Sequence, residues 1–169
     1  MSRLAFITGA TSGIGLATAR ILAENGYRLA LAARSKERLE QICVEMEDQY
    51  SVHSEMFVMD VREEEQINAA VNQCIEKQGI PDILINDAGL ARGLESYDKT
   101  SVPDIKQMID TNIRGLFFGD TCISSFYDKT QYRTYYQYWI DSRTLCLCGS
   151  CRLLCDKGCC KNIQRRCAY

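Results

Sequence analysis

Near its N-terminus the chain reads Thr8-Gly9-Ala10-Thr11-Ser12-Gly13-Ile14-Gly15, between the apolar run Leu4-Ala5-Phe6-Ile7 and apolar residues at helical spacing. This order predicts a strand, a glycine-rich turn and a helix. Glycine lets the backbone come close to a ligand. The N–H groups at the start of a helix, with the positive end of its dipole, suit a phosphate. We therefore expect a nucleotide pyrophosphate site at this turn.

Further short apolar runs alternate with segments that have helical periodicity. In segment 36–50, Leu39, Ile42, Cys43 and Met46 recur at i, i+3, i+4 and i+7, which predicts one buried stripe. A second helix is predicted over 67–75, with its end at Gly79. The remaining predicted strands, each given with the residue that ends it, are 27–33 (Arg34), 56–59 (Asp60) and 83–85 (Asn86).

Strands at this spacing, separated by amphipathic helices, predict βαβ units and a parallel sheet that is covered on both faces. In such sheets ligands bind beyond the carboxyl ends of the strands, where the strand order reverses. Thr8, Arg34, Asp60 and Asn86 each stand at one of the four predicted ends. The sequence thus predicts an α/β fold with its site at this edge.

The composition fits one globular domain. The chain has 169 residues, 46% of them hydrophobic and 25% charged, with a net charge of −2. No signal-peptide pattern precedes the first strand, and no apolar run approaches the roughly 18 residues of a membrane span. We expect a cytoplasmic protein in a reducing compartment. Its partner is expected to be a small-molecule substrate, with no role for nucleic acid or membrane.

Charge and cysteine divide the chain near residue 120. Residues 1–120 hold 12 Lys/Arg and 19 Asp/Glu, net −7, whereas residues 121–169 hold 8 and 3, net +5. Cys43 and Cys74 are the only cysteines of the first part, and eight lie in the second. The second part shows neither helical nor strand periodicity. We therefore expect a dinucleotide-binding region over 1–120 and an irregular or disordered tail over 121–169.

Up to about Asp120 the chain resembles a classical short-chain dehydrogenase/reductase. Five features occur in the family's order: the glycine-rich turn, a basic residue after the second strand, Asp60-Val61, the Asn-x-Ala-Gly at 86–89, and Asp110-Thr111-Asn112. The resemblance implies a Rossmann-type doubly wound parallel sheet with four of the family's seven strands. Residues 88–91 and 108–112 are most similar to the branch of NADP-dependent 3-hydroxy acid dehydrogenases.

The resemblance implies a set of cofactor-binding residues. Arg34 stands where an acid would accept from the ribose 2′-OH of NAD, and an arginine there suits the extra phosphate of NADP, so NADP is favoured over NAD. Ser35 could contact that phosphate or cap the next helix. Seven residues of the glycine-rich turn complete this part of the set: Thr8, Gly9, Thr11, Ser12, Gly13, Ile14 and Gly15.

The resemblance also implies cofactor-binding roles for residues after the third and fourth predicted strands. Asp60 is expected to accept from the adenine amino group, beside Val61, although it could simply begin a helix. Asn86, Ala88 and Gly89 are expected behind the ribose, where close backbone approach is needed. At position 87 an aspartate replaces the family's second asparagine, and its charge either weakens cofactor binding or turns outward.

By the resemblance, Asn112 is the first member of the family's catalytic set that can be matched. In the family this asparagine helps to hold a lysine and a water; alternatively Asn112 kinks or caps a helix. We expect a helix to begin at Asn112. His53, the only histidine, is expected on the surface.

The rest of the family's catalytic set would be a serine on a fifth strand and a Tyr-x-x-x-Lys on the next helix. Residues 121–169 contain no Tyr-x-x-x-Lys, so activity is expected to be impaired.

The genetic code suggests where the missing residues went. When the last two bases of each codon are read with the first base of the next, Trp139-Ile140 gives glycine and Ile140-Asp141 permits serine. In the same frame 153–157 permits Tyr-Cys-Ala-Thr-Lys, at the family's distance from that serine. We therefore interpret the tail as a frameshift readout that begins near Asp120 and truncates the family sequence.

A competing interpretation is that the cysteine-rich segment 146–160 binds zinc. It has enough thiols, but it lacks two Cys-x-x-Cys pairs and has no histidine. Without the later strands, the strand at 83–85 would be an exposed sheet edge and an aggregation risk.

The resemblance as a whole implies an NADP-dependent oxidoreductase acting on a small hydroxy acid or a related alcohol. The family forms homo-dimers or homo-tetramers, which the truncation puts in doubt. The alternative function is a non-enzymatic NADP-binding remnant.

Overall fold

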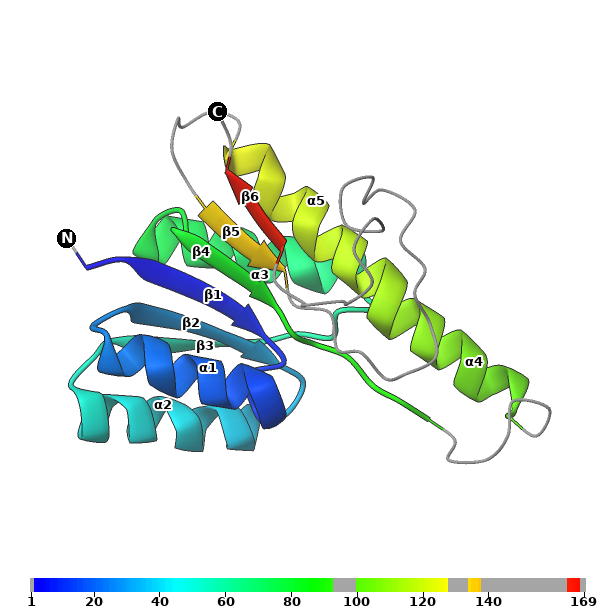
Figure 1. Ribbon diagram of the computed structural model, residues 1–169, viewed down its shortest axis with the longest axis horizontal. Helices are drawn as coiled ribbons and strands as arrows, with labels where there is room; N and C mark the ends of the chain where they lie inside the picture. The colour runs from blue at the N-terminus through cyan, green and yellow to red at the C-terminus, as the bar shows by residue number, and fades with distance from the viewer. Residues whose placement is uncertain (1, 93–99, 128–133, 138–163, 168–169) are drawn as a thin grey trace.

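The computed structural model describes residues 2–92, 100–127, 134–137 and 164–167 (Figure 1). The first half alternates strands and helices as predicted. Its elements are β1 (Leu4–Thr8), α1 (Gly13–Glu24), β2 (Arg28–Ala33), α2 (Lys36–Tyr50), β3 (Ser54–Val58), α3 (Glu64–Gln78) and β4 (Ile83–Asn86). The later elements are α4 (Val102–Ile109), the π-helical turn η2 (Asp110–Arg114), α5 (Gly115–Tyr127), β5 (Thr134–Gln137) and β6 (Gln164–Cys167).

The strands form one sheet in the order β3-β2-β1-β4-β5-β6. The neighbours from β3 to β5 run parallel, and β6 is antiparallel to β5. The order reverses at β1, from which the chain proceeds to β2 on one side and later to β4 on the other. The predicted Rossmann-type arrangement of the first four strands is therefore confirmed. It places the carboxyl ends of β1, β2, β3 and β4 on the same side of the molecule.

The structure corrects the expectation that β4 is a sheet edge. β5 lies beside β4, with Ile85 opposite Tyr136, and β6 lies beside β5 (Figure 1). An unpaired strand edge offers a row of N–H and C=O groups, and the sequence Thr-Tyr-Tyr-Gln of β5 favours extended backbone. Periodicity did not reveal β5, because its residues Thr-Tyr-Tyr-Gln form neither an apolar run nor an apolar-polar alternation.

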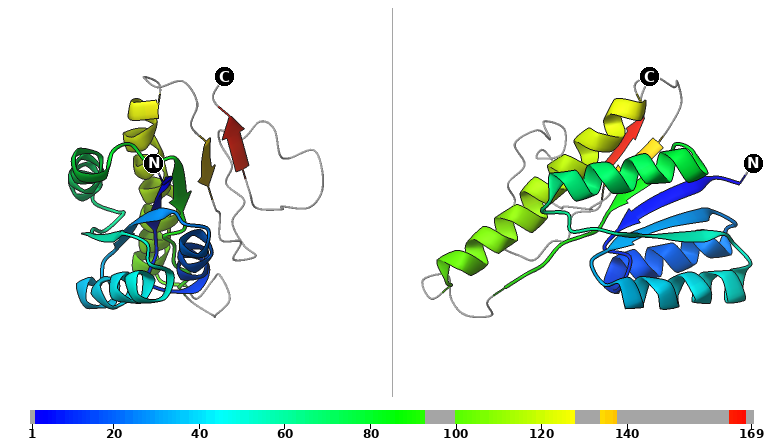
Figure 2. Two further views of the ribbon diagram at one scale, coloured as in Figure 1. Left: turned by 90° about the vertical axis from the view of Figure 1, so that its left-hand side faces the viewer. Right: turned by 180° about the vertical axis from the view of Figure 1, so that it is seen from behind.

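Alternate residues of the parallel strands pack on opposite faces of the sheet. Leu4 and Phe6 of β1 join a core with residues of α3, while Ala5 and Ile7 join a second core with residues of α1 and α2. All four side chains are buried. Both faces of the sheet are thus covered, as the continuous apolar runs predict, and the two helical layers can be followed in Figure 2.

α4, η2 and α5 form one continuous helical rod, whose α4 end projects away from the sheet (Figure 1). The rod begins at Val102, with Ser101 as its N-cap, so the expectation of a helix start at Asn112 is wrong. Asn112 instead lies inside the π-helical turn, where the helix changes its winding. Within the described residues, no helix is long and apolar enough to cross a membrane.

Candidate functional site

An open cavity of about 630 Å³ lies at the carboxyl ends of β1–β4. Eleven of the predicted site residues line it: Gly9, Thr11, Ser12, Gly13, Ile14, Arg34, Ser35, Asp60, Val61, Ala88 and Gly89. Four predicted residues are not part of its lining: Thr8, Gly15, Asn86 and Asn112. The lining also includes seven residues that were not in the predicted set: Ala32, Ala33, Glu37, Met59, Asp87, Leu90 and Thr111.

The glycines of the first turn are required for two different reasons. A Cβ on Gly15 would lie 2.5 Å from the Gly9 carbonyl oxygen, so this position serves close packing inside the turn. Gly13 has φ +57°, and a Cβ there would meet no atom within 4 Å. Gly13 therefore opens onto the cavity, whereas Gly15 holds the turn against its surroundings.

The N-cap residue of α1 does not cap its own helix. Ser12 is the N-cap residue, but its side chain makes no capping hydrogen bond, and the first turn carries no acidic residue. By contrast, Ser35 and Ser101 accept from backbone N–H groups and cap α2 and α4. The first N–H groups of a helix need partners, and those of α1 begin at the lining residues Gly13 and Ile14. This end of the cavity fits a phosphate group.

Thr8 holds the ends of β1 and β4 together. Its Oγ1 accepts from the N–H groups of Asp87 and Ala88, at 3.1 Å each. The Thr8 side chain is buried and does not reach the cavity surface. It positions the Asn-x-Ala-Gly segment beneath the glycine-rich turn, where a Cβ on Gly9 would already lie 2.8 Å from the Ala88 nitrogen.

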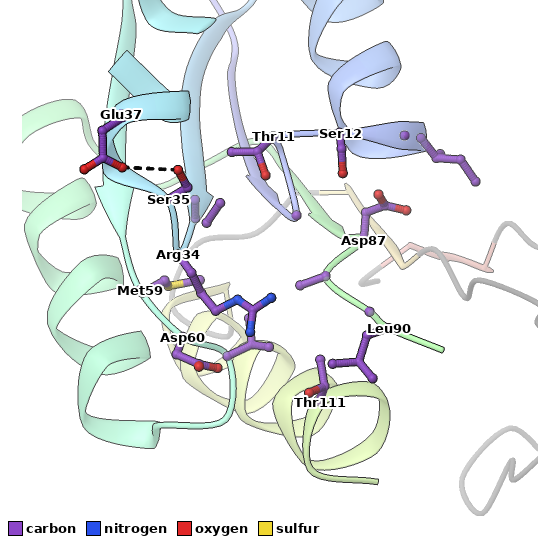
Figure 3. Close-up of a pocket in the computed structure, with 18 residues that line it drawn as sticks. Thr11, Ser12, Arg34, Ser35, Glu37, Met59, Asp60, Asp87, Leu90 and Thr111 are labelled. Carbon is purple, nitrogen blue, oxygen red and sulfur yellow. Dashed lines mark hydrogen bonds between the residues drawn. The ribbon is translucent and has the colours of Figure 1, made fainter. Parts of the chain in front are cut away.

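Arg34 projects into the cavity from the end of β2 (Figure 3). Ser35 has the capping role: its Oγ accepts from Arg38 N–H at 3.4 Å and donates to a Glu37 carboxylate oxygen at 3.4 Å. Glu37 also lines the cavity. A single guanidinium and one carboxylate therefore face the region beyond β2, and the guanidinium is the group that suits a phosphate monoester.

Asp60 lies at the end of β3, with its carboxylate bound by Arg62. Both carboxylate oxygens accept from the Arg62 side chain, and Oδ1 also accepts from the Arg62 N–H at 3.0 Å. The Arg62 hydrogen bonds lower the pKa of Asp60 and keep it ionised. The expected contact of Asp60 with adenine stays a prediction. The structure adds Arg62, two positions along the chain, as the residue that orients this carboxylate.

Asp87 turns inward. It is 6% exposed, and burial raises its pKa to about 6, while the N–H of Gly15 favours the charged form. Among the described residues, its Oδ1 has no hydrogen-bond partner. Of the two orientations that the sequence left open, the structure therefore has the one in which the carboxyl group lies next to the glycine-rich turn.

Asn86 and Asn112 contact neighbouring segments instead of the cavity. Asn86 is buried beneath α5, where a Cβ on Gly119 would lie 3.1 Å from its Oδ1. Asn112 exchanges hydrogen bonds with the backbone of Leu90, the residue that follows Gly89. The expected catalytic role of Asn112 stays a prediction. His53 is exposed and lies outside the cavity, as expected.

Two groups of residues at the site were not predicted from the sequence. Met59, Leu90 and Thr111 enter the lining because they neighbour predicted residues. The glycines Gly115 and Gly119 let α5 pass close to the strand ends, since a Cβ on Gly115 would lie 2.7 Å from the Val61 carbonyl oxygen. Their spacing of one helical turn was the available signal. Segment 146–160, for which zinc binding was the competing interpretation, lies outside the described residues.

Comparison with known proteins identifies the class. The chain matches the short chain dehydrogenase family over residues 3–131, and it belongs to this family. Sulfoacetaldehyde reductase 2 of Chromohalobacter salexigens is 39% identical over 116 residues, which are 69% of this chain and 45% of the reductase. The chain thus spans less than half the length of this curated relative.

Solved structures agree with this assignment. An alcohol dehydrogenase of Thermococcus sibiricus, solved with 5-hydroxy-NADP, has a TM-score of 0.71 at 33% identity, covering 74% of this chain and 53% of its own. The serine dehydrogenase of Escherichia coli has a TM-score of 0.64 at 31% identity, covering 72% of this chain and 55% of its own. The shared part corresponds to the family's oxidoreductase fold.

Proposed function

We propose that this chain binds NADP in the cavity at the carboxyl ends of β1–β4, and that NADP is preferred over NAD. The observation that carries this proposal is the pairing of the α1 N-terminus, which Ser12 does not cap, with Arg34 in one cavity. A dinucleotide with a 2′-phosphate presents a diphosphate and a phosphate monoester, one for each of these groups. The alcohol dehydrogenase of Thermococcus sibiricus, solved with a NADP derivative, supports the choice.

Each part of the cavity has a defined role in this proposal. The N–H groups of Gly13 and Ile14 and the hydroxyl of Ser12 would bind the diphosphate. Arg34 would bind the 2′-phosphate, and Asp60, held by Arg62, would face the adenine together with Val61. Ala88 and Gly89 would lie against the ribose, because small residues allow close approach there. When bound, the cofactor supplies the hydride donor or acceptor of the family's chemistry.

The proposed reaction of the intact family member is hydride transfer between the nicotinamide and the carbonyl or hydroxyl group of a small hydroxy acid or a related alcohol. Two similar proteins support a small polar substrate: their names specify sulfoacetaldehyde and serine, and serine is itself a 3-hydroxy acid. We infer a cytoplasmic setting from the same family.

We further propose that the chain as written transfers no hydride. Residues 121–169 contain no Tyr-x-x-x-Lys, the motif that would exchange the substrate proton, and the codons permitted for 153–157 would encode it in a shifted frame. Sequencing the coding DNA around codons 115–160 tests this directly. Codons that cannot be reread as a strand ending in Gly-Ser and a later Tyr-x-x-x-Lys would rule out the frameshift.

The binding proposal is tested by fluorescence titration of the full chain with NADPH and NADH. We expect saturable binding with a lower Kd for NADPH. A 3-hydroxy acid oxidation assay on the chain and on a version with the restored frame then separates the functions. Turnover only in the restored version supports the proposal, turnover in both contradicts the inactivity, and absence of binding in both contradicts the cofactor site.

A further inference from the structure

A buried carboxyl group lies against the part of the cavity proposed for the cofactor diphosphate. Asp87 follows β4 and lines the cavity, and its carboxyl group points toward Ser12 and the start of α1 (Figure 3). It is packed so closely that a Cβ on Gly15 would lie 2.8 Å from Oδ2. The other oxygen, Oδ1, is buried and has no hydrogen-bond partner in the part of the chain that the structure describes. Burial without a partner for Oδ1 disfavours the charged carboxylate and favours the protonated carboxyl group.

Among the described residues, the groups packed around Asp87 include the N–H groups at the start of α1 but no positively charged side chain. Gly9, Ser12 and Gly15 face it from the glycine-rich turn and α1, and Thr8 contacts its backbone from β1. The charged side chains that line the cavity are Arg34, Glu37 and Asp60, which project from the ends of β2 and β3 on the other side of the cavity (Figure 3). The Gly15 N–H is the group that favours the charged form.

We propose that Asp87 takes up a proton from solvent when the cofactor diphosphate binds, so that cofactor binding weakens as the pH rises. The inference rests on the proposed NADP site. Two anions cannot share a buried space without a cost, and protonation of Oδ1 or Oδ2 removes the charge of one of them. The neutral acid also gains an O–H that can donate to a phosphate oxygen.

The expected pH range follows from the free protein. Burial sets the pKa of Asp87 at about 6 before any ligand is present. A neighbouring diphosphate raises this pKa further, since a like charge disfavours ionisation. Proton uptake is therefore largest between the two values, above about pH 6. If binding raises the pKa by one unit, the Kd rises about tenfold across this range and then levels off.

The test uses the full chain and isothermal titration with NAD and NADP in buffers of different ionisation enthalpy. NAD is included because the 2′-phosphate of NADP has its own second ionisation near pH 6. The Asp87→Asn variant keeps the size and loses the titration. Asp48→Asn, on the exposed face of α2, makes the same change in net charge outside the cavity.

For the unchanged chain and Asp48→Asn, we expect net proton uptake on NAD binding and a Kd for NAD that rises with pH. For Asp87→Asn, NAD binding should become nearly independent of pH and stronger than that of the unchanged chain at about pH 8. Equal pH dependence of Asp87→Asn and the unchanged chain would overturn the proposal, as would NAD binding to the unchanged chain without proton uptake. Absence of binding to every variant at every pH would instead contradict the NADP site itself.

Discussion

The side-chain amide of Asn112 pairs with the backbone of Leu90 through two hydrogen bonds. The Leu90 N–H donates to Asn112 Oδ1, and Asn112 Nδ2 donates to the Leu90 carbonyl oxygen, each at 2.8 Å. This pairing joins the π-helical turn η2 to the segment that follows β4. Leu90 lines the cavity, so Asn112 fixes one of its walls without being part of the lining.

Replacement of Asn112 by alanine should therefore loosen the segment after β4. Loss of two partly buried hydrogen bonds costs about 1–3 kcal/mol. We expect faster hydrogen exchange at Leu90 and weaker NADPH binding, measured by exchange mass spectrometry and fluorescence titration. Asn72→Ala, on the exposed face of α3, serves as the control. Unchanged exchange at Leu90 in Asn112→Ala would show that the pairing does not order this segment.

Thr8→Val should destabilise the fold more than its small change in shape suggests. The valine fills the space but leaves the N–H groups of Asp87 and Ala88 without the oxygen that accepts from both. An unpaired buried donor costs about 1–3 kcal/mol. Urea denaturation should show this loss for Thr8→Val and little loss for Thr8→Ser, which keeps the hydroxyl group. Equal stability of the two variants would contradict a stabilising role for the hydrogen bonds to Thr8 Oγ1.

Gly13→Ala and Gly26→Ala form a matched pair. Both glycines have positive φ, at +57° and +75°, and neither Cβ would meet an atom within 4 Å. The two variants should lose a similar amount of stability, about 1–2 kcal/mol, from the left-handed backbone alone. Only Gly13 lines the cavity, so only Gly13→Ala should also weaken NADPH binding. Equal binding by both variants would place the diphosphate elsewhere.

Arg34→Ala should reduce the affinity for NADPH and leave the affinity for NADH nearly unchanged. A charge-assisted contact between a guanidinium and a phosphate contributes about 1.5–3 kcal/mol, which corresponds to roughly a tenfold to hundredfold change in Kd. Arg20→Ala is the control, because Arg20 pairs with Glu45 outside the cavity. An equal loss of affinity for NADPH and NADH in Arg34→Ala would mean that Arg34 does not contact the 2′-phosphate.

Asp87 should make the unchanged chain less stable as the pH rises. Its pKa is raised in the folded state from 3.8 to about 6, so the folded chain binds the proton more tightly than the unfolded chain. The destabilisation is absent below about pH 4, develops as the pH rises to 6, and is complete above that, at about 3 kcal/mol. Asp87→Asn should therefore gain stability over the unchanged chain in urea titrations near pH 8, but not near pH 4. A constant difference across this range would indicate that Asp87 titrates normally.

The sequence by itself determined the parallel sheet and most of its site. Short apolar runs that alternate with amphipathic helical segments predicted buried parallel strands, and the helix over 36–50 has the predicted bounds. Residues at the strand ends, such as Arg34, Asp60 and Gly89, converge because parallel strands end at one edge. Local pattern and topology were sufficient here, since each position depends on its own strand.

Only the tertiary structure decided which side chains at the carboxyl ends of the strands face the cavity and which ones position neighbouring segments. Thr8 and Asn112 bind the backbones of residues 80 and 22 positions away, respectively, so no local pattern could separate their positioning role from a direct contact with a ligand. The same holds for Asp87: whether a carboxylate turns outward or lies buried beneath Gly15 depends on how closely β1, α1 and β4 pack. Hydrogen-bond partners and desolvation are set by distant segments, which the fold brings together.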